Sequence, residues 1–99
     1  MGTYVVLSNF TDQGIRNVKD TVKRADAFKT LAKSHGVTVK ELFWTQGKYD
    51  VVAILEASDE AAIMTLSLSN AALGNVRGQT LRAFSAAETK AALDKMRSA

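Results

Sequence analysis

The chain has 99 residues, of which 46% are hydrophobic, and its 13 basic and 10 acidic side chains give a formal net charge of +3. This length predicts one small domain, residues 1–99, whose core is only marginally large, so that burial of further surface by self-association would stabilise it. The basic residues are spread along the chain, which argues against nucleic-acid binding, and the lack of cysteine excludes disulfides, thiolate metal ligands and cysteine nucleophiles.

No targeting or membrane-spanning segment is visible. Met1-Gly2 leads directly into a strand-like run, and no apolar stretch approaches the roughly 20 residues that a membrane span requires. We therefore expect a cytoplasmic protein without a membrane segment.

The first predicted element is a strand over residues 3–10, which is short and rich in β-branched and aromatic residues. Thr11-Asp12 can cap a helix start, and apolar residues at helical spacing follow as far as His35. The expected apolar stripe comprises Ile15, Val18, Val22, Ala25, Phe28, Leu31 and Ala32. One straight helix would be about 36 Å long, against about 26 Å for the strand, so we expect a break near Lys19-Asp20-Thr21.

The middle of the chain predicts an antiparallel hairpin. Residues 37–45 alternate, with Val37/Val39/Glu41/Phe43 on one face and Thr38/Lys40/Leu42/Trp44 on the other. A turn at Gln46-Gly47-Lys48 follows, in which Gly47 is free to take a positive φ. The third strand, from Tyr49 to Glu56, carries apolar residues at both odd and even positions, so both of its faces need cover.

A second helix and a fourth strand complete the predicted sheet. Ser58-Asp59-Glu60 opens the helix, Gly74-Asn75 ends it, and residues 76–84 read as a strand. The order β-α-β-β-α-β predicts an α+β, ferredoxin-like fold, in which two helices cover one face of a four-stranded antiparallel sheet.

The last predicted element is a C-terminal helix. Ser85 followed by Glu88 is a capping-box pattern, and the weak apolar side of this helix (Ala92, Leu93, Met96) predicts a loosely docked tail.

The open face of the predicted sheet requires cover. Several apolar residues of the third strand would point into it, and two copies of the chain could cover them by packing sheet against sheet about a two-fold axis. We expect a homodimer or a higher even oligomer formed through this face.

Three stretches carry a family resemblance. They are Gly47-Lys48-Tyr49-Asp50, Asn9-Phe10-Thr11-Asp12-Gln13-Gly14 upstream and Thr80-Leu81-Arg82-Ala83-Phe84 downstream. In order and spacing they resemble the GYD domain family, named after a Gly-x-Tyr-Asp core, over nearly the whole chain. This resemblance implies the fold of the dimeric α+β barrel proteins and implies little about activity.

Residues 45–85 are also more distantly similar to the effector-binding domain of the Lrp/AsnC transcription regulators. Those domains pair as sheets and bind small molecules, such as amino acids, between subunits. The chain has no room for their helix-turn-helix, so the similarity implies a sensor or binding module and not an operator-binding protein.

Five residues are candidates for a ligand site: Asn9, Trp44, Tyr49, Asp50 and Arg82. Three of them, Asn9, Trp44 and Arg82, come from different predicted strands and could line one pocket, where the planar guanidinium could bind an anion. Either Tyr49 or Asp50 could face a pocket between sheet and helix or between subunits.

Structural roles for the same residues stay open. Asp50 could accept hydrogen bonds from turn or neighbouring-strand amides, while Tyr49 fills space with its hydroxyl bound to a partner. The other three could serve ordinary edge packing or an intersubunit ion pair.

The sequence predicts neither a metal nor a cofactor. His35 is the only histidine, and at an expected helix end it can cap carbonyl groups or interact with the helix dipole. Without cysteine or a histidine pair a structural zinc site is not expected. Some enzymes of the barrel that the chain resembles bind haem through an axial histidine, and a surface residue at a helix end is badly placed for this.

The favoured function is a non-catalytic, homo-oligomeric small-molecule binding domain, with its site near the Tyr49 strand and the subunit interface. The alternative is a cofactor-independent monooxygenase or isomerase of small aromatic substrates, as several proteins with the resembled barrel are. Asn9, Trp44 and Tyr49 could orient such a substrate in a dry cavity, although no nucleophile–base pair is visible. A third possibility is a protein that only assembles or partners another protein.

Overall fold

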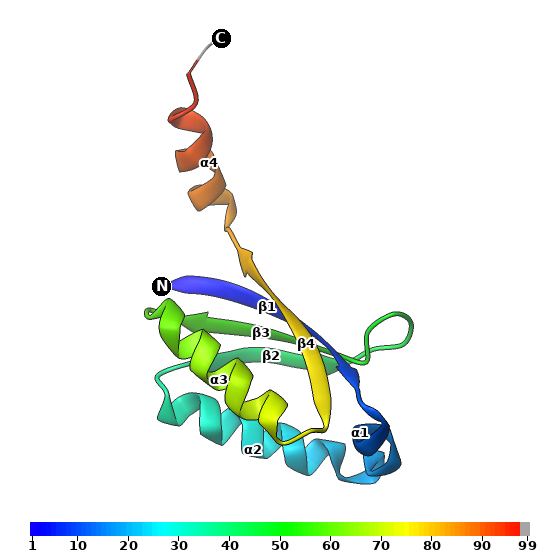
Figure 1. Cartoon of the computed structure of the whole chain (residues 1–99). Coiled ribbons are helices and arrows are strands. Elements are labelled where there is room, and N and C mark those ends of the chain that lie inside the picture. Colours follow the sequence, from blue (N-terminus) through cyan, green and yellow to red (C-terminus); the bar gives the residue numbers. More distant parts are fainter. Residues whose placement is uncertain (98–99) are drawn as a thin grey trace.

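A computed structural model describes residues 1–97 of the chain (Figure 1). The elements in chain order are β1 (Gly2–Phe10), α1 (Asp12–Arg16), the 3-10 turn η1 (Val18–Asp20), α2 (Thr21–Ser34), β2 (Thr38–Trp44), β3 (Val51–Ala57), α3 (Glu60–Ala72), β4 (Val76–Ala83) and α4 (Ala86–Asp94). This order confirms the predicted β-α-β-β-α-β arrangement and its C-terminal helix.

The four strands form one antiparallel sheet in the order β2-β3-β1-β4. The central strand β1 pairs through Val5 with Ile54 of β3 on one side and with Leu81 of β4 on the other. The predicted hairpin joins β2 to β3, and Gly47 takes a φ of 110° in its turn. The sheet and its two covering helices confirm the α+β, ferredoxin-like fold.

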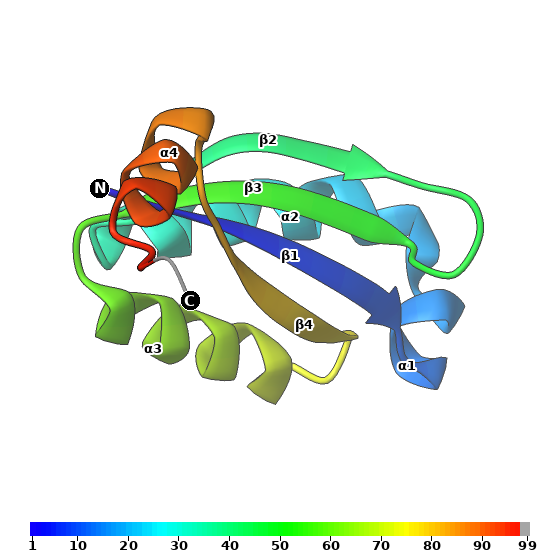
Figure 2. The same ribbon diagram turned by 90° about the horizontal axis from the view of Figure 1, so that it is seen from above.

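The core lies between one face of the sheet and the helices α2 and α3, which both cover that face (Figure 2). Its buried apolar side chains are Tyr4, Ala32, Val37, Ala53, Leu55, Ala57, Ile63 and Leu66. Even-numbered residues of β1 and odd-numbered residues of β3 therefore face the helices. Because side chains alternate along a strand, their neighbours in sequence face the opposite side of the sheet.

The first predicted helix is broken where the length mismatch indicated. The turn η1, Val18–Asp20, separates α1 from α2. The turn also changes the helical phase, so two residues of the predicted stripe lie outside the core: Ile15 is 53% exposed and Val22 is 58% exposed. The side of α2 that faces the sheet instead consists of Ala25, Phe28, Leu31 and Ala32.

A bulge in β2 changes which of its residues share a face. The register with β3 shifts between Val39 and Glu41. Before the shift Val39 pairs with the helix-facing residue Leu55, and after it Leu42 and Trp44 pair with the helix-facing residues Ala53 and Val51. The predicted strict alternation of β2 is therefore wrong, because the extra residue of a bulge reverses the parity of the side chains that follow it.

The opposite face of the sheet has an apolar centre that neither α2 nor α3 covers, and α4 stands in front of one end of its strands (Figure 2). The register places Val5, Leu7, Phe43, Val52, Ile54 and Leu81 on it. Phe43 is 54% exposed there. We call these six residues the open sheet face.

The last helix, α4, extends away from the rest of the molecule (Figure 1). Its first turn has the predicted capping box, in which Ser85 Oγ accepts from the Glu88 amide at 3.1 Å and Glu88 Oε1 accepts from the Ser85 amide at 3.0 Å. The tail is thus a projecting helix, with no packing of its apolar side against the α2 and α3 layer.

Candidate functional site

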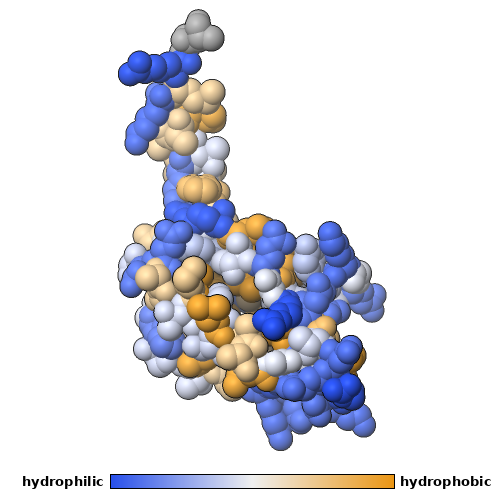
Figure 3. All heavy atoms as spheres, in the orientation of Figure 1, coloured by the Kyte–Doolittle hydropathy of each residue, from blue (hydrophilic) through white to orange (hydrophobic). Residues whose placement is uncertain are grey.

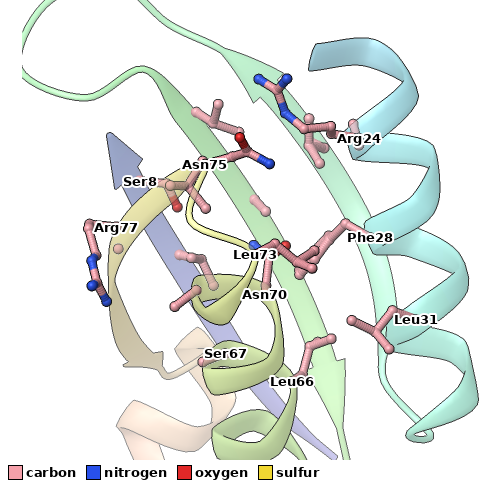
Figure 4. Close-up of a pocket in the computed structure, with 18 of the residues that line it drawn as sticks. Ser8, Arg24, Phe28, Leu31, Leu66, Ser67, Asn70, Leu73, Asn75 and Arg77 are labelled. Carbon is pink, nitrogen blue, oxygen red and sulfur yellow. The ribbon is translucent and has the colours of Figure 1, made fainter. Parts of the chain in front are cut away.

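A cleft of about 520 Å³ opens between α2 and α3 on the helix-covered face of the sheet (Figure 4). It exists because α2 packs mainly against β2 at one edge of the sheet while α3 packs mainly against β4 at the other. The middle of the sheet is left as the floor. This volume lies within the range of about 300–1,000 Å³ that small-molecule sites occupy.

The floor of the cleft is built from small residues. Ser8 of β1 pairs with Gly78 of β4, and Ala53 lies nearby on β3. A Cβ atom added at Gly78 would lie 2.9 Å from the Ser8 Oγ atom, so glycine at this position leaves room for the hydroxyl. The walls are apolar: Phe28 and Leu31 come from α2, and Leu66 comes from α3 (Figure 4).

The polar groups of the cleft are hydroxyls, amides and a guanidinium. Ser8 lies at the floor, and Asn70 and Asn75 lie on the side of α3 and the turn that follows it (Figure 4). Among the described residues, no aspartate or glutamate lines the cleft, and the two charged residues of its lining are Arg24 and Arg77. Arg77 extends away from the cleft in Figure 4, so Arg24 dominates the charge at the mouth.

Two hydrogen-bonded side chains form the mouth. Arg24 donates to the carbonyl oxygens of Asn17 at 2.7 Å and Gly14 at 3.3 Å, which fixes the guanidinium at the α1 end of the cleft. Trp44, at the end of β2, donates from its indole Nε1 to Thr21 Oγ1 at 3.0 Å. The indole is 44% exposed, so its ring borders both the cleft and the solvent.

The helix α1 docks on the turn between α3 and β4, which carries the cleft residue Asn75. Thr11 Oγ1 donates to the Gly74 carbonyl at 2.6 Å and accepts from the Gly14 amide at 3.1 Å. Gln13 Nε2 donates to Asn75 Oδ1 at 3.0 Å. A Cβ atom at Gly14 would lie 1.9 Å from the Asn75 carbonyl oxygen, so only glycine permits this approach.

The Gly-x-Tyr-Asp segment has structural contacts. Asp50 Oδ2 accepts from the Phe10 backbone amide at 2.9 Å, which confirms the predicted hydrogen bond from a neighbouring-strand amide. Tyr49 points its hydroxyl to within 3.5 Å of Gln79 Oε1. Gln79 pairs with Leu7, so Tyr49 lies over the open sheet face and not in the cleft.

The five predicted site residues do not come together. Trp44 alone lines the cleft. Asn9 pairs with Arg77 and faces the open side of the sheet, whereas Arg82 pairs with Tyr4, about 17 Å further along β4. The guanidinium of Arg82 contacts Glu88 Oε2 at 3.0 Å, which is an ion pair within the chain. A ligand-binding role for these residues stays a prediction.

Sequence reasoning missed the cleft residues Ser8, Arg24, Asn70 and Asn75. The signal that could have found them is the run of small residues at the centre of predicted strands, since Ser8, Ala53 and Gly78 leave a depression that larger residues would fill. The distance between α2 and α3 is not encoded in either helix alone.

These features define a small ferredoxin-like α+β domain with a cleft between its two covering helices. The GYD domain family matches residues 4–93, and the chain belongs to this family.

Two relatives from the bacterium Thermus thermophilus are similar to the chain. The first, named "Glutamine synthetase and cystathionine beta-lyase binding protein", is 34% identical over 94 residues, which cover 94% of this chain and 99% of the relative. The second, a protein of known crystal structure, is 25% identical with a TM-score of 0.57, over 87% of this chain and 96% of that one.

None of the helices between residues 1 and 97 combines the length and the apolar character needed to cross a bilayer. In the same part of the chain, no three His, Cys, Asp or Glu side chains are grouped so that they could hold a metal ion.

Proposed function

We propose that this GYD domain protein binds a small molecule in the cleft between α2 and α3, and that it does so as a homo-oligomer without catalysing a reaction. The observation that carries the proposal is the cleft itself, with about 520 Å³ of space, apolar walls and a few convergent polar groups. Such a cavity in a chain of 99 residues occupies the place where further core side chains would add stability. Because the chain leaves this space open despite the stability that it would gain by filling it, we infer that a ligand occupies the space.

The lining of the cleft supports a neutral or anionic ligand with an apolar body. Phe28, Leu31 and Leu66 offer apolar contact, and Ser8 and Asn70 offer hydrogen bonds. Arg24 places a positive charge at the mouth, with no carboxylate of the described lining to balance it. A ligand with a carboxylate at one end would therefore bind more tightly than the same ligand with an amine.

The absence of a carboxylate or histidine from the described lining supports binding in place of acid–base catalysis. Hydroxyl and amide groups orient a ligand, whereas general acid–base catalysis needs a group whose pKa is close to the working pH. The open sheet face supports the homo-oligomer, because its six apolar residues are covered if two copies pack sheet against sheet.

The test combines native mass spectrometry with thermal unfolding. The spectrum of freshly purified protein would carry a reproducible extra mass if a ligand is retained. Phenylpropionate, its amide and the corresponding amine then serve as matched probes, and we expect the acid to raise the melting temperature most because a ligand specific to the folded state stabilises it by mass action.

A cleft-filling variant identifies the place of binding. Asn70→Trp puts a large ring into the cleft and should abolish the effect of the probe, whereas Thr65→Trp, on an exposed side of α3 away from the cleft, should preserve it. Equal stabilisation by the amine, or a probe effect that survives Asn70→Trp, would contradict the proposed site.

The rival function, a cofactor-independent monooxygenase, predicts a different observation. Oxygen would be consumed with an electron-rich aromatic compound, and Trp44→Phe or Asn9→Ala would stop this without unfolding the protein. We expect no oxygen consumption.

A second candidate function is binding to a metabolic enzyme, in line with the name of the 34% identical relative. The outer side of α3 offers a surface for it: Met64 is 66% exposed and Leu68 is 65% exposed, beside a groove that ends at Arg82. Purified glutamine synthetase and cystathionine beta-lyase can be tested directly by surface-immobilised binding. Met64→Asp, at a residue that does not line the cleft, should remove any binding, and Thr65→Asp should not.

A further inference from the structure

The helix α4 is too short to be stable in water without a surface to pack against. It has nine residues, projects away from the sheet and shares no extensive contact with another element of the described chain (Figure 1). Isolated helices shorter than about 12–15 residues are marginal in water, because few hydrogen bonds offset the entropy of nucleation. A surface that packs against α4 is therefore required for it to be stably helical.

One side of α4 is suited to packing. At helical spacing Ala86, Thr89 and Leu93 lie along one side of α4, and Met96 continues this line just beyond its last residue; we call these four residues the α4 stripe. Leu93 is 57% exposed and Met96 is 71% exposed. In Figure 3 the more hydrophobic atoms of α4 lie on the right of the helix and the hydrophilic atoms lie on the left. Figure 1, in the same orientation, shows the strands below extending to the right.

The direction of α4 is fixed by its first turn. Arg82 bonds Glu88 at 3.0 Å, and its guanidinium lies 4.4 Å from the centroid of the Phe84 ring and 5.5 Å from that of Tyr4. A further bond from Arg82 reaches the Thr3 carbonyl at 3.4 Å. These contacts join α4 to the ends of β1 and β4, so the helix is an oriented arm.

The arm rises on the uncovered side of the sheet. Figure 2, which looks down on the sheet, shows α4 in front of one end of the strands, and Figure 1 shows α2 and α3 below the strands, on the opposite side. Anything that covers the open sheet face is therefore flanked by α4. A second copy stacked on that face would meet the α4 stripe and the open sheet face together.

The chain exposes enough surface area for a second copy to bury. The chain exposes 6953 Å². A compact monomer of this mass exposes about 5,500 Å², so the excess is about 1,400 Å². A stable homodimer buries at least about 800 Å² on each subunit, which is less than this excess. The radius of gyration, 15.4 Å, likewise exceeds the roughly 13 Å of a compact chain of this length.

We infer that α4 is a clasp. In the dimer the second copy covers the open sheet face, and the α4 stripe of each copy packs against the side of the other copy that lies next to it. This inference rests on the proposed sheet pairing and goes beyond it by assigning to α4 a place on the second copy. The two-fold symmetry makes the exchange reciprocal, so two clasps form in each dimer.

Matched charge variants measured by sedimentation equilibrium test the clasp. Leu93→Asp with Met96→Asp puts two charges on the α4 stripe and should raise the dissociation constant of the dimer at least about tenfold. Ala87→Asp with Ala91→Asp puts the same charges on another side of α4 and should change the constant by less than about twofold. All four residues are exposed, so neither pair disturbs the folded monomer.

Hydrogen exchange of α4 supplies a direct readout. Amides of α4 should be protected in the dimer and should lose protection when the protein is diluted below the dissociation constant. The clasp is overturned if the amides of α4 stay protected in the monomer, or if they become protected only when a different protein is added. It is also overturned if Leu93→Asp with Met96→Asp leaves the dimer as strong as before, a result that would still be compatible with sheet pairing. A monomeric wild type would overturn both the clasp and the sheet pairing. Neither outcome bears on the cleft, which Asn70→Trp tests separately.

Discussion

Asp50 Oδ2 accepts a hydrogen bond from the backbone amide of Phe10 at 2.9 Å, across the ends of two neighbouring strands. The backbone of Asp50 adds two more bonds at this point: its amide donates to the Ser8 carbonyl at 2.9 Å, and its carbonyl accepts from the Thr45 amide at 2.8 Å. One residue therefore joins β1 to the base of the β2–β3 hairpin. The aspartate of the Gly-x-Tyr-Asp core accordingly has a structural role.

Replacing Asp50 should lower stability. Asp50→Ala leaves the half-buried Phe10 amide without its acceptor, which costs about 1–3 kcal/mol of unfolding free energy, measured by urea titration. Asp50→Asn keeps a side-chain oxygen that can accept and should cost less. Asp26→Ala, at an exposed carboxylate of α2, is the control and should stay within about 0.5 kcal/mol of wild type. Equal stability of Asp50→Ala and wild type would show that this bond contributes nothing.

Gly14→Ala should be more damaging than an alanine at an open glycine. The added Cβ atom would lie 1.9 Å from the Asn75 carbonyl oxygen, so α1 must move off the α3–β4 turn, at about 3 kcal/mol. Gly36→Ala meets no atom within 4 Å and is opposed only by its φ of 75°, at about 1 kcal/mol. Urea titration measures the loss of unfolding free energy in each variant, which is steric in Gly14→Ala and due to backbone conformation in Gly36→Ala. If Gly14→Ala is the milder change, the close docking of α1 is not maintained in solution.

Trp44 should report on ligand binding through its fluorescence. It is the only tryptophan of the chain, and its ring borders the mouth of the cleft. A ligand that covers the ring removes water from it, so the emission should move to shorter wavelength with a midpoint equal to the calorimetric dissociation constant. Trp44→Phe should abolish this signal while the heat of binding persists. Heat of binding without a change in emission would place the ligand outside the cleft.

The helical content of α4 should fall in acid. A hydrogen bond from the Ser85 backbone and a second from the Arg82 side chain hold the pKa of Glu88 below its ordinary value of 4.5. The contribution of the carboxylate to α4 is therefore complete above pH 4.5 and is lost as the pH falls through the lowered pKa. Carbon chemical shifts of residues 86–94, followed by NMR, should record this loss.

Glu88→Gln is the control for the acid titration. Glutamine can form both capping-box bonds and does not titrate, so the shifts of α4 in this variant should be nearly independent of pH in the same range. A matching loss of helix in Glu88→Gln would assign the effect to another carboxylate.

The sequence determined the order of the elements because each depends on local patterns. Side-chain alternation predicted the strands, Thr11 and Ser85 predicted helix starts, and Gly47 predicted the hairpin turn. The break before α2 followed from the length of a strand against that of a helix. The hydrogen bond of Asp50 could also be foreseen, since an aspartate next to a turn has few other partners than amides.

Only the tertiary structure decided where the cleft lies and which residues line it. The bulge in β2 moved Trp44 to the helix-facing side, because one extra residue reverses the direction of every side chain that follows it in the strand. The turn η1 changed the helical phase between α1 and α2, so Ile15 and Val22 do not share the core-facing side of α2. Asn9, Trp44 and Arg82 lie apart within the chain, because the register sends these residues to different faces and ends of the sheet. Register and helix spacing are set by contacts between distant segments, which no local pattern contains.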